Sequence, residues 1–571
     1  MRKNEEKGRN TGTDTTERNA MELFLEDVEA QIQYKPAARR ISKELYGHLE
    51  DKTEEYKSEG LAEEEAMSCA VRDMGDAAAL GVMMNDTHRV KLPWVFILSV
   101  VMAVLLGIAG NIAEYGSGDF SFEEKLFWAA GNSIYFPLGL LVFAAVLWKG
   151  YPWIVRYSNR VLAAAILLLS LMTVISELNY SALERWLGRI GFMATYMLSL
   201  PVIILTVPNL MVLAYKLRSC KMAGIIAIMC LFGIQFLSYS RSTGTVNFSY
   251  RLVAFAAFLI SMVFMGIKKY FRISPQKAIP AIIIPGILIA GLWGMENKEM
   301  LSDFSLQCFQ PELHAKNAWD DSYNSILIRN LLPQAKLFGR LTLPEETLKD
   351  YYMADWYFDG NEDTEIPNRI YREEHWKYAS KELTDILPQH YHNNYRIAYW
   401  ILQYGWGPGI FLLLCVAAVY ALMLKLILRI HNPMGKAIST ACFICLAGQT
   451  VLYTAGNFGF QFGWFTTFPF ISEGNVSIVM NMMLAGLIAS SYSYDHAISE
   501  EEELKIFRPL RKKVTAADLR SYDKRKGLTT EWILRKAKHI KICSRHMTEN
   551  GWQAQSTGFM QRSPERTVIN R

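Results

Sequence analysis

Long apolar runs separated by polar connections dominate the pattern of this chain. A helix of about twenty apolar residues, rising 1.5 Å per residue, crosses the hydrocarbon core of a bilayer. About ten runs of roughly this length occur, so the pattern predicts an all-α polytopic membrane protein with about ten transmembrane helices. The runs lie near residues 92–112, 132–148, 161–176, 192–214, 220–238, 249–267, 278–296, 408–428, 436–456 and 475–493.

The connections between these runs differ in charge. Four alternate connections are rich in Lys and Arg and contain no Asp or Glu, whereas the connections between them carry acids such as Glu114, Asp119, Glu177 and Glu473. Because positively charged loops stay cytoplasmic, the pattern places both chain ends in the cytoplasm. The basic residues are Lys149, Arg156, Arg160, Lys216, Arg218, Lys221, Lys268, Lys269, Arg272, Lys277, Lys425, Arg429 and Lys436.

Two hydrophilic segments precede the first apolar run. Residues 1–20 are polar and predicted to be disordered. Residues 21–88 show apolar positions at helical spacing, and Pro36, Gly60 and Asp76 are typical of helix ends. The pattern therefore predicts a small helical domain on the cytoplasmic side.

Two further polar segments lie later in the chain. Residues 297–395, between predicted helices seven and eight, form the largest extracytoplasmic loop, and its apolar pieces predict amphipathic helices over part of it. Residues 495–571 form a basic cytoplasmic tail, either solvated or attracted to the anionic inner leaflet.

Composition adds limits to this topology. The net charge of +5 mostly reflects the basic connections and tail, so no nucleic-acid partner is predicted. Of eight cysteines, Cys308 alone falls in a sizeable predicted outer segment, which excludes a disulfide framework. The start of the chain lacks a charged-then-apolar leader, so the first apolar run is expected to direct its own insertion.

Residues 456–477, GNFGFQFGWFTTFPFISEGNVS, stand between the last two apolar runs. Irregular backbone within a membrane protein is tolerated where protein or a water-filled cavity satisfies it, so a re-entrant segment fits this stretch. An ordinary extracytoplasmic hairpin is the alternative, with Gly474 and Asn475 supplying the turn and the cap of the last helix.

Part of this stretch, FPFISEGNVS at 468–477, resembles the LPFISYGGS sequence that precedes the last helix of the SEDS family. That family comprises the FtsW, RodA and SpoVE proteins, which polymerise lipid II into peptidoglycan. Its ten helices, cytoplasmic termini and large outer loop between helices seven and eight agree with the topology predicted for residues 92–494. The resemblance implies a divergent SEDS-like protein of the bacterial cytoplasmic membrane.

A second stretch matches the family where its catalytic acid lies. Residues 392–395, His-Asn-Asn-Tyr, fall on the family's His-Thr-Asp-Phe, whose Asp is thought to act as catalytic base. Leu402, Gln403 and Gly405 fall on the family's Glu-Glu-x-Gly. The position of the acid is therefore occupied by Asn394.

An amide has no basic site comparable to a carboxylate, and general-base assistance typically contributes about 10²–10⁴-fold to a rate. The family mechanism therefore does not transfer unchanged to Asn394. Asp385 is a substitute base if the loop brings it over Asn394, and Glu473, beside the PFIS stretch, is another. The alternative interpretation is that Asn393 or Asn394 N-caps helix eight.

A lipid II site also needs cations for the pyrophosphate, and guanidinium groups suit phosphate oxygens. Residues 185–186 are similar to the family's Arg-Trp, 240–245 correspond to its QPDLGT with Arg241 in the altered part, and 336–340 are similar to its Gly-Lys-Gly. A snorkelling side chain at a helix end is the alternative for each arginine. The expected substrate-binding residues are Arg185, Trp186, Arg241, Arg340, Arg396, Pro469, Ser472 and Gly474.

No metal site or other cofactor is predicted. His375, His390 and His392 lie close in sequence, but no second pair stands at ligand spacing on a recognisable helix. A divalent cation is compatible with the family chemistry without being indicated by these residues.

Residues 21–88 resemble the permease prefix domain, a helical module ahead of bacterial membrane proteins, through the sequences GLAEEEA and MGD. The resemblance implies contact with a cytoplasmic regulator, and PadR-type regulators accompany such domains elsewhere. A stability or insertion appendage is the alternative. The SEDS resemblance implies lipid II, or another undecaprenyl-linked precursor, and a class B penicillin-binding protein as partners.

Three hypotheses follow for the function. The first is a peptidoglycan glycosyltransferase using lipid II in division, cell shape or sporulation. The second is a non-catalytic relative that binds the lipid-linked precursor or a partner synthase as a regulated scaffold. The third is a transporter of the precursor, which the scarcity of ionisable residues deep in the helices disfavours.

Overall fold

A computed structural model describes residues 20–115, 133–177, 202–243, 248–314, 321–352, 376–388, 391–472 and 475–498, with the single residues 123 and 200. Within these ranges, the chain forms helices and no strand. Among the described residues, eight helical stretches are long and apolar enough to cross a membrane, with Val202–Ser238 counted as one stretch. The predicted class, an all-α polytopic membrane protein, is confirmed. Residues 1–19, which were predicted to be disordered together with Ala20, lie outside the described residues, whereas Ala20 belongs to the first helix. The tail from residue 499 onward also lies outside the described residues.

The N-terminal domain consists of four helices around its own core. Asp76 caps the fourth helix as predicted, since its carboxylate accepts the N–H of Ala78 at 3.1 Å. Pro36 lies in the first turn of the second helix, which ends just before Gly60. Buried apolar side chains of the first two helices, with Ala70 of the third, form the core. The helices are α1 (Ala20–Gln31), α2 (Lys35–Ser58), α3 (Glu63–Asp73) and α4 (Ala77–His88).

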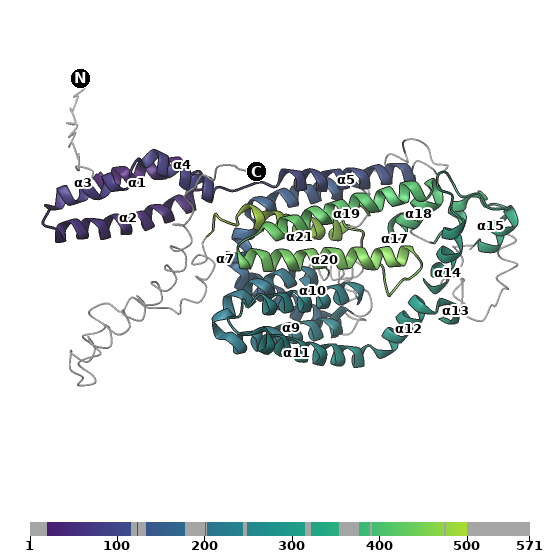
Figure 1. Ribbon diagram of the computed structural model, residues 1–571. Coiled ribbons are helices and arrows are strands. Elements are labelled where there is room, and N and C mark those ends of the chain that lie inside the picture. The colour runs from purple at the N-terminus through teal and green to yellow at the C-terminus, as the bar shows by residue number, and fades with distance from the viewer. Residues whose placement is uncertain are drawn as a thin grey trace, which may run out of the picture. The chain divides into compact units, whose positions relative to one another are not determined.

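The membrane domain is a bundle of long helices that share one hydrophobic core. Figure 1 shows α5, α19, α20, α21 and α9 to α11 running along one direction, with α20 and α21 between α5 and α19 on one side and α9 to α11 on the other. Helix α21 is the most enclosed of the described membrane-spanning helices, with 78% of its apolar stretch buried inside the protein. The long helices are α5 (Trp94–Tyr115), α7 (Tyr135–Glu177), a helix over 202–216, α9 (Lys221–Thr243), α10 (Phe248–Ile267), α11 (Pro275–Glu296), α19 (Trp406–Arg429), α20 (Pro433–Asn457) and α21 (Asn475–Ser493).

The expected count of about ten separate helices was wrong in one respect. The runs 132–148 and 161–176 belong to one continuous helix, α7, which passes through Lys149 and Arg160 without a loop. Charge interrupts a hydropathy pattern but does not itself end a helix, and α7 also continues past Pro152. The runs 192–214 and 220–238 do separate, because η1 (Leu217–Cys220) breaks the helix between them.

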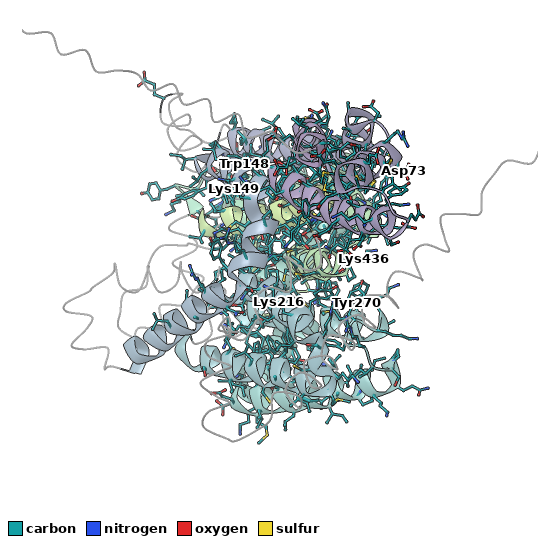
Figure 2. All side chains as sticks on the ribbon, turned by 90° about the vertical axis from the view of Figure 1, so that its left-hand side faces the viewer. Asp73, Trp148, Lys149, Lys216, Tyr270 and Lys436 are labelled. Atoms are coloured by element: carbon teal, nitrogen blue, oxygen red, sulfur yellow. The ribbon has the colours of Figure 1, made fainter. Side chains whose placement is uncertain are left out.

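Basic connections gather at one end of the bundle. Figure 2 views this end and labels Lys149, Lys216 and Lys436, which come from three different parts of the chain. Lys216 is buried and donates to the carbonyl of Val155 and to Ser158 Oγ at 3.0 Å. This grouping agrees with the charge pattern used above, and the assignment of that end to the cytoplasm stays a prediction.

Shorter helices from residues 298–404 gather at the opposite end of the bundle, beside the ends of α5 and α20 (Figure 1). The predicted partial folding of the 297–395 segment into helices is therefore confirmed for its described residues. These elements are α12 (Lys298–Phe309), α13 (Pro311–His314), α14 (Asp321–Leu331), η2 (Leu332–Gln334), α15 (Glu345–Tyr351), η3 (Leu383–Ile386), α17 (Tyr391–Asn394) and α18 (Arg396–Tyr404).

Candidate functional site

The candidate site is organised around Arg396, whose side chain is fully buried at the start of α18. Its guanidinium donates to the carbonyl of Ile471, to Asn111 Oδ1 on α5, and to the carbonyl of His392 at 3.1 Å. Asn111 is itself buried and donates to Ser133 Oγ at 3.2 Å. One cation therefore joins three segments that are far apart in sequence.

The amide groups at the start of α18 are satisfied by α20. The N–H of Arg396 donates to the Tyr453 hydroxyl at 3.2 Å, and those of Ile397 and Ala398 donate to Asn457 Oδ1 at 2.9 and 3.1 Å. A helix N-terminus leaves such amides without partners in the helix, so Asn457 acts as an N-cap supplied by another helix.

The interpretation of Asn393 or Asn394 as the N-cap of helix eight was wrong. Both residues lie in the short helix α17, and their backbone carbonyls accept hydrogen bonds from α20. The Tyr453 hydroxyl donates to the carbonyl of Asn393 at 2.6 Å, and Asn457 Nδ2 donates to that of Asn394 at 2.9 Å. The Asn394 side chain is half-buried and does not cap α18.

The PFIS stretch forms a buried turn. Pro469, Ile471 and Ser472 are all buried, and the Ser472 hydroxyl accepts the N–H of Phe468 at 2.8 Å. Phe470 adopts φ of 71°, a conformation that strains a side chain other than glycine. The predicted substrate-binding residues Pro469 and Ser472 therefore shape the turn whose Ile471 carbonyl meets Arg396.

Much of the remaining 458–472 segment is held against the bundle, while the Phe460 and Trp464 side chains are exposed. Ser249 Oγ of α10 donates to the Trp464 carbonyl, and Arg329 Nε of α14 donates to that of Gly459 at 2.8 Å. Gln461 is buried and accepts the Tyr395 hydroxyl at 2.6 Å. This enclosure agrees with the predicted irregular segment held by protein, rather than an exposed hairpin.

The KLFGR stretch meets the end of α18. The N–H of Gly339 donates to the Tyr404 carbonyl at 2.8 Å, and that of Gly407 donates to the Leu337 carbonyl at 2.9 Å. Gly405 has φ of 102°, and a Cβ there would lie 2.6 Å from the Leu337 carbonyl oxygen. Two of the family-like stretches thus pair through their backbones, and the pairing requires glycine at 405.

Asp385 and Arg340 belong to a neighbouring network. The Asp385 carboxylate accepts the Ser380 hydroxyl at 2.8 Å from each oxygen and the N–H of Glu382 at 3.1 Å, which caps η3. Arg340 donates to Glu382 Oε2 at 2.8 Å. Asp385 is therefore held within its own segment, and its proposed action on a substrate stays a prediction.

Several predicted site residues lie outside the described structure. These are Arg185, Trp186, Glu473 and Gly474, together with His375 and His390. Arg241 lies at the C-terminal end of α9, and its side chain is not described. The predictions for all of these residues stand as they were made.

Four residues that hold the site together were not predicted from the sequence: Asn111, Tyr453, Asn457 and Gln461. A signal was present, because Asn111, Tyr453 and Asn457 are polar residues at the ends of apolar runs, where buried polar groups need partners. The hydrogen-bond partner of each residue could not be predicted from the neighbouring sequence, because that partner lies far away along the chain.

Comparisons with known proteins add little to this picture. No family model matches the chain, and no curated protein matches it. Among solved structures, the chain is similar to one from "Structural coordination of polymerization and crosslinking by a peptidoglycan synthase complex", with 13% sequence identity and a TM-score of 0.44. The match covers 70% of this chain and 98% of the other. At these values, no function or residue role is transferred from it.

Proposed function

We propose that this chain is a divergent FtsW/RodA/SpoVE-like protein of the bacterial cytoplasmic membrane, which binds a lipid-linked precursor and serves peptidoglycan synthesis. Lipid II is the precursor that the sequence resemblance favours. Both chain ends, including the N-terminal domain, are assigned to the cytoplasm by the charge pattern.

The observation that carries this proposal is the junction at Arg396. The sequence resemblance singled out residues 392–405 and 468–477 independently, and a buried guanidinium binds the carbonyls of His392 and Ile471 within them. The third family-like stretch, 336–340, pairs with residues 404–407 through the backbone. The three stretches therefore surround one region at the predicted outer end of the bundle, as a shared substrate site requires.

Glycosyl transfer is the first candidate chemistry. A hydroxyl of one glycan attacks the anomeric carbon of the other, the lipid pyrophosphate leaves, and a base removes the hydroxyl proton. The base must come from Asp385 or Glu473 if Asn394 cannot supply it. Arginines such as Arg340 would balance the pyrophosphate charge, and a class B penicillin-binding protein is the proposed partner enzyme.

A non-catalytic scaffold is the second candidate, and two observations favour it. Asn394 carries an amide where the family has an acid. Both carboxylate oxygens of Asp385 already accept the Ser380 hydroxyl, and Oδ2 also accepts the N–H of Glu382, which caps η3. Under this candidate, the protein binds the precursor or a partner synthase without polymerising glycan, and the N-terminal domain regulates that binding.

The two candidates separate in one assay. Purified protein is given labelled lipid II, alone and with a class B penicillin-binding protein, and glycan polymers are resolved on a gel. Asn394→Asp is tested beside Asn393→Asp, a matched control that adds the same charge one residue away.

We expect Asn394→Asp to create or raise polymerisation, by up to about 10²-fold, and Asn393→Asp to leave it unchanged. Polymer from the wild type supports the enzyme and directs attention to Asp385→Asn and Glu473→Gln. Polymer from Asn394→Asp alone supports the scaffold. A folded wild type that neither polymerises nor binds lipid II would overturn the proposed function.

A further inference from the structure

At the opposite end of the bundle, three side chains that none of the chemistry above uses converge on one point. His431 lies in the connection between α19 and α20, and Asp495 and His496 follow α21. His431 Nδ1 lies 3.1 Å from Asp495 Oδ2, and His496 Nε2 lies 3.4 Å from the same oxygen. The ligand atoms of all three residues lie within 4.8 Å of one another.

The backbone fixes this arrangement. The Asp495 carboxylate accepts the N–H of His431 at 2.9 Å and that of Asn432 at 2.7 Å, and its side chain is only 6% exposed. Asn432 Oδ1 accepts the N–H of Met434 at 2.9 Å and so caps α20. The carboxylate is therefore held between α19, α20 and α21 before any ligand arrives.

The two distances from Asp495 Oδ2 to the imidazole nitrogens match the spacing of ligands around a small tetrahedral ion. Zinc binds His nitrogen and carboxylate oxygen at about 2.0–2.2 Å, which places tetrahedral ligand atoms about 3.3–3.5 Å apart. The two oxygen-to-nitrogen distances, 3.1 and 3.4 Å, lie close to this ligand-to-ligand distance. The imidazole side chains are 76% and 42% exposed, so an ion can enter and a water molecule can complete the coordination.

We propose that His431, Asp495 and His496 form a binding site for a divalent transition metal, with Zn²⁺ as the best-suited ion. Two imidazoles with one carboxylate favour zinc over magnesium or calcium, which prefer all-oxygen surroundings. Three protein ligands leave a fourth position for water, the ligand number of open zinc sites.

A metal ion at this site links the α19–α20 connection to the end of α21. Because α21 is the most enclosed helix of the bundle, the ion would stabilise the packing of the membrane domain by binding the folded state alone. This role is independent of lipid II and of the outer site.

The test uses the detergent-solubilised full chain, stripped with a chelator and then titrated with Zn²⁺ or with Co²⁺ as a spectroscopic probe. We expect one equivalent of Co²⁺ to give the intense visible bands of tetrahedral coordination, and Zn²⁺ to displace it and raise the melting temperature. His431→Ala and His496→Ala should each weaken binding by at least about tenfold. His48→Ala, an exposed histidine on α2, is the matched control and should bind as the wild type.

Both imidazoles are partly exposed, so these variants should fold, which gel filtration and unchanged melting without metal will verify. Unchanged Zn²⁺ affinity in the double variant His431→Ala/His496→Ala would overturn the proposal and assign the binding to other histidines. Absence of a Zn²⁺-dependent rise in melting temperature in the wild type would overturn it as well.

Discussion

The two ends of the bundle fix their connecting segments in opposite ways. At the predicted outer end, the Arg396 guanidinium is fully buried and its described partners are neutral carbonyl and amide oxygens. At the other end, the Asp495 carboxylate is buried while His431 stands largely exposed. A buried charge surrounded by fixed acceptors cannot exchange partners at low cost, whereas exposed imidazoles can. The comparison suggests a permanent junction at the first end and a reversible one at the second.

Removing the charge of Arg396 should produce the largest effect. Arg396→Met leaves the Ile471 carbonyl and Asn111 Oδ1 buried without this donor, so we expect a loss of about 3–5 kcal/mol in unfolding free energy. Arg396→Lys should not restore it, because one ammonium cannot reach acceptors on three segments at once. Thermal or chemical unfolding in detergent measures the loss.

The control is Arg340→Met, which removes a partly exposed arginine paired with Glu382. That change should cost less than about 1 kcal/mol. Equal losses of unfolding free energy in Arg396→Met and Arg340→Met would mean that Arg396 does not hold the three segments together.

Gly405→Ala should follow in size. A Cβ at this position meets the Leu337 carbonyl oxygen at 2.6 Å in a backbone conformation that alanine rarely adopts. We expect a loss of about 2–4 kcal/mol, combining backbone strain with the contact. Gly339→Ala is the matched control, because its φ is also positive but nothing lies within 4 Å of its Cβ. A loss as large at Gly339 would show that strain alone, and not the pairing of the two stretches, sets the cost.

Asn457→Ala should have a moderate effect, because the N–H groups of Ile397 and Ala398 lose their acceptor. An N-cap of this kind is worth about 1–2 kcal/mol. Asn394→Ala should change the unfolding free energy by less than about 0.5 kcal/mol, since its side chain caps nothing. A larger loss of unfolding free energy in Asn394→Ala than in Asn457→Ala would mean that Asn394 is the cap and that its role is in stability, not in catalysis.

The smallest effect should come from the exposed ion pair between Lys381 and Glu345. The hydrogen bond from Lys381 at 2.7 Å lowers the pKa of Glu345, so any stabilisation exists above the ordinary carboxyl pKa and disappears as pH falls through the lowered value. Lys381→Ala should leave the melting temperature at neutral pH unchanged, because solvent screens such pairs. A clear neutral-pH loss that vanishes in acid would show that exposed charges also hold the outer segment.

Local pattern was enough to predict most helices. Hydropathy located all ten apolar runs within helical stretches wherever they are described, and Asp76 was identified as a cap because its acceptor serves an amide two residues away. The N-terminal helix boundaries followed for the same reason, since proline, glycine and capping residues act within one turn.

The candidate site could be predicted only in part. Residues 392–405 and 468–477 were singled out by their resemblance, but nothing in either stretch indicated that Arg396 would bind the Ile471 carbonyl, 75 residues away. The interpretation that Asn393 or Asn394 N-caps helix eight was wrong, because the separate helix α18 stands between them and α19, whose N-cap residue is Gly405.

The sequence by itself determined where apolar helices form and which connections carry charge, since both depend on neighbours within a few turns. Tertiary structure decided which polar groups meet. Asn111 joins Arg396 across 285 residues, and His431 joins Asp495 across 64. Each polar residue in an apolar run signals that it needs a partner, but the packing of the helices selects that partner.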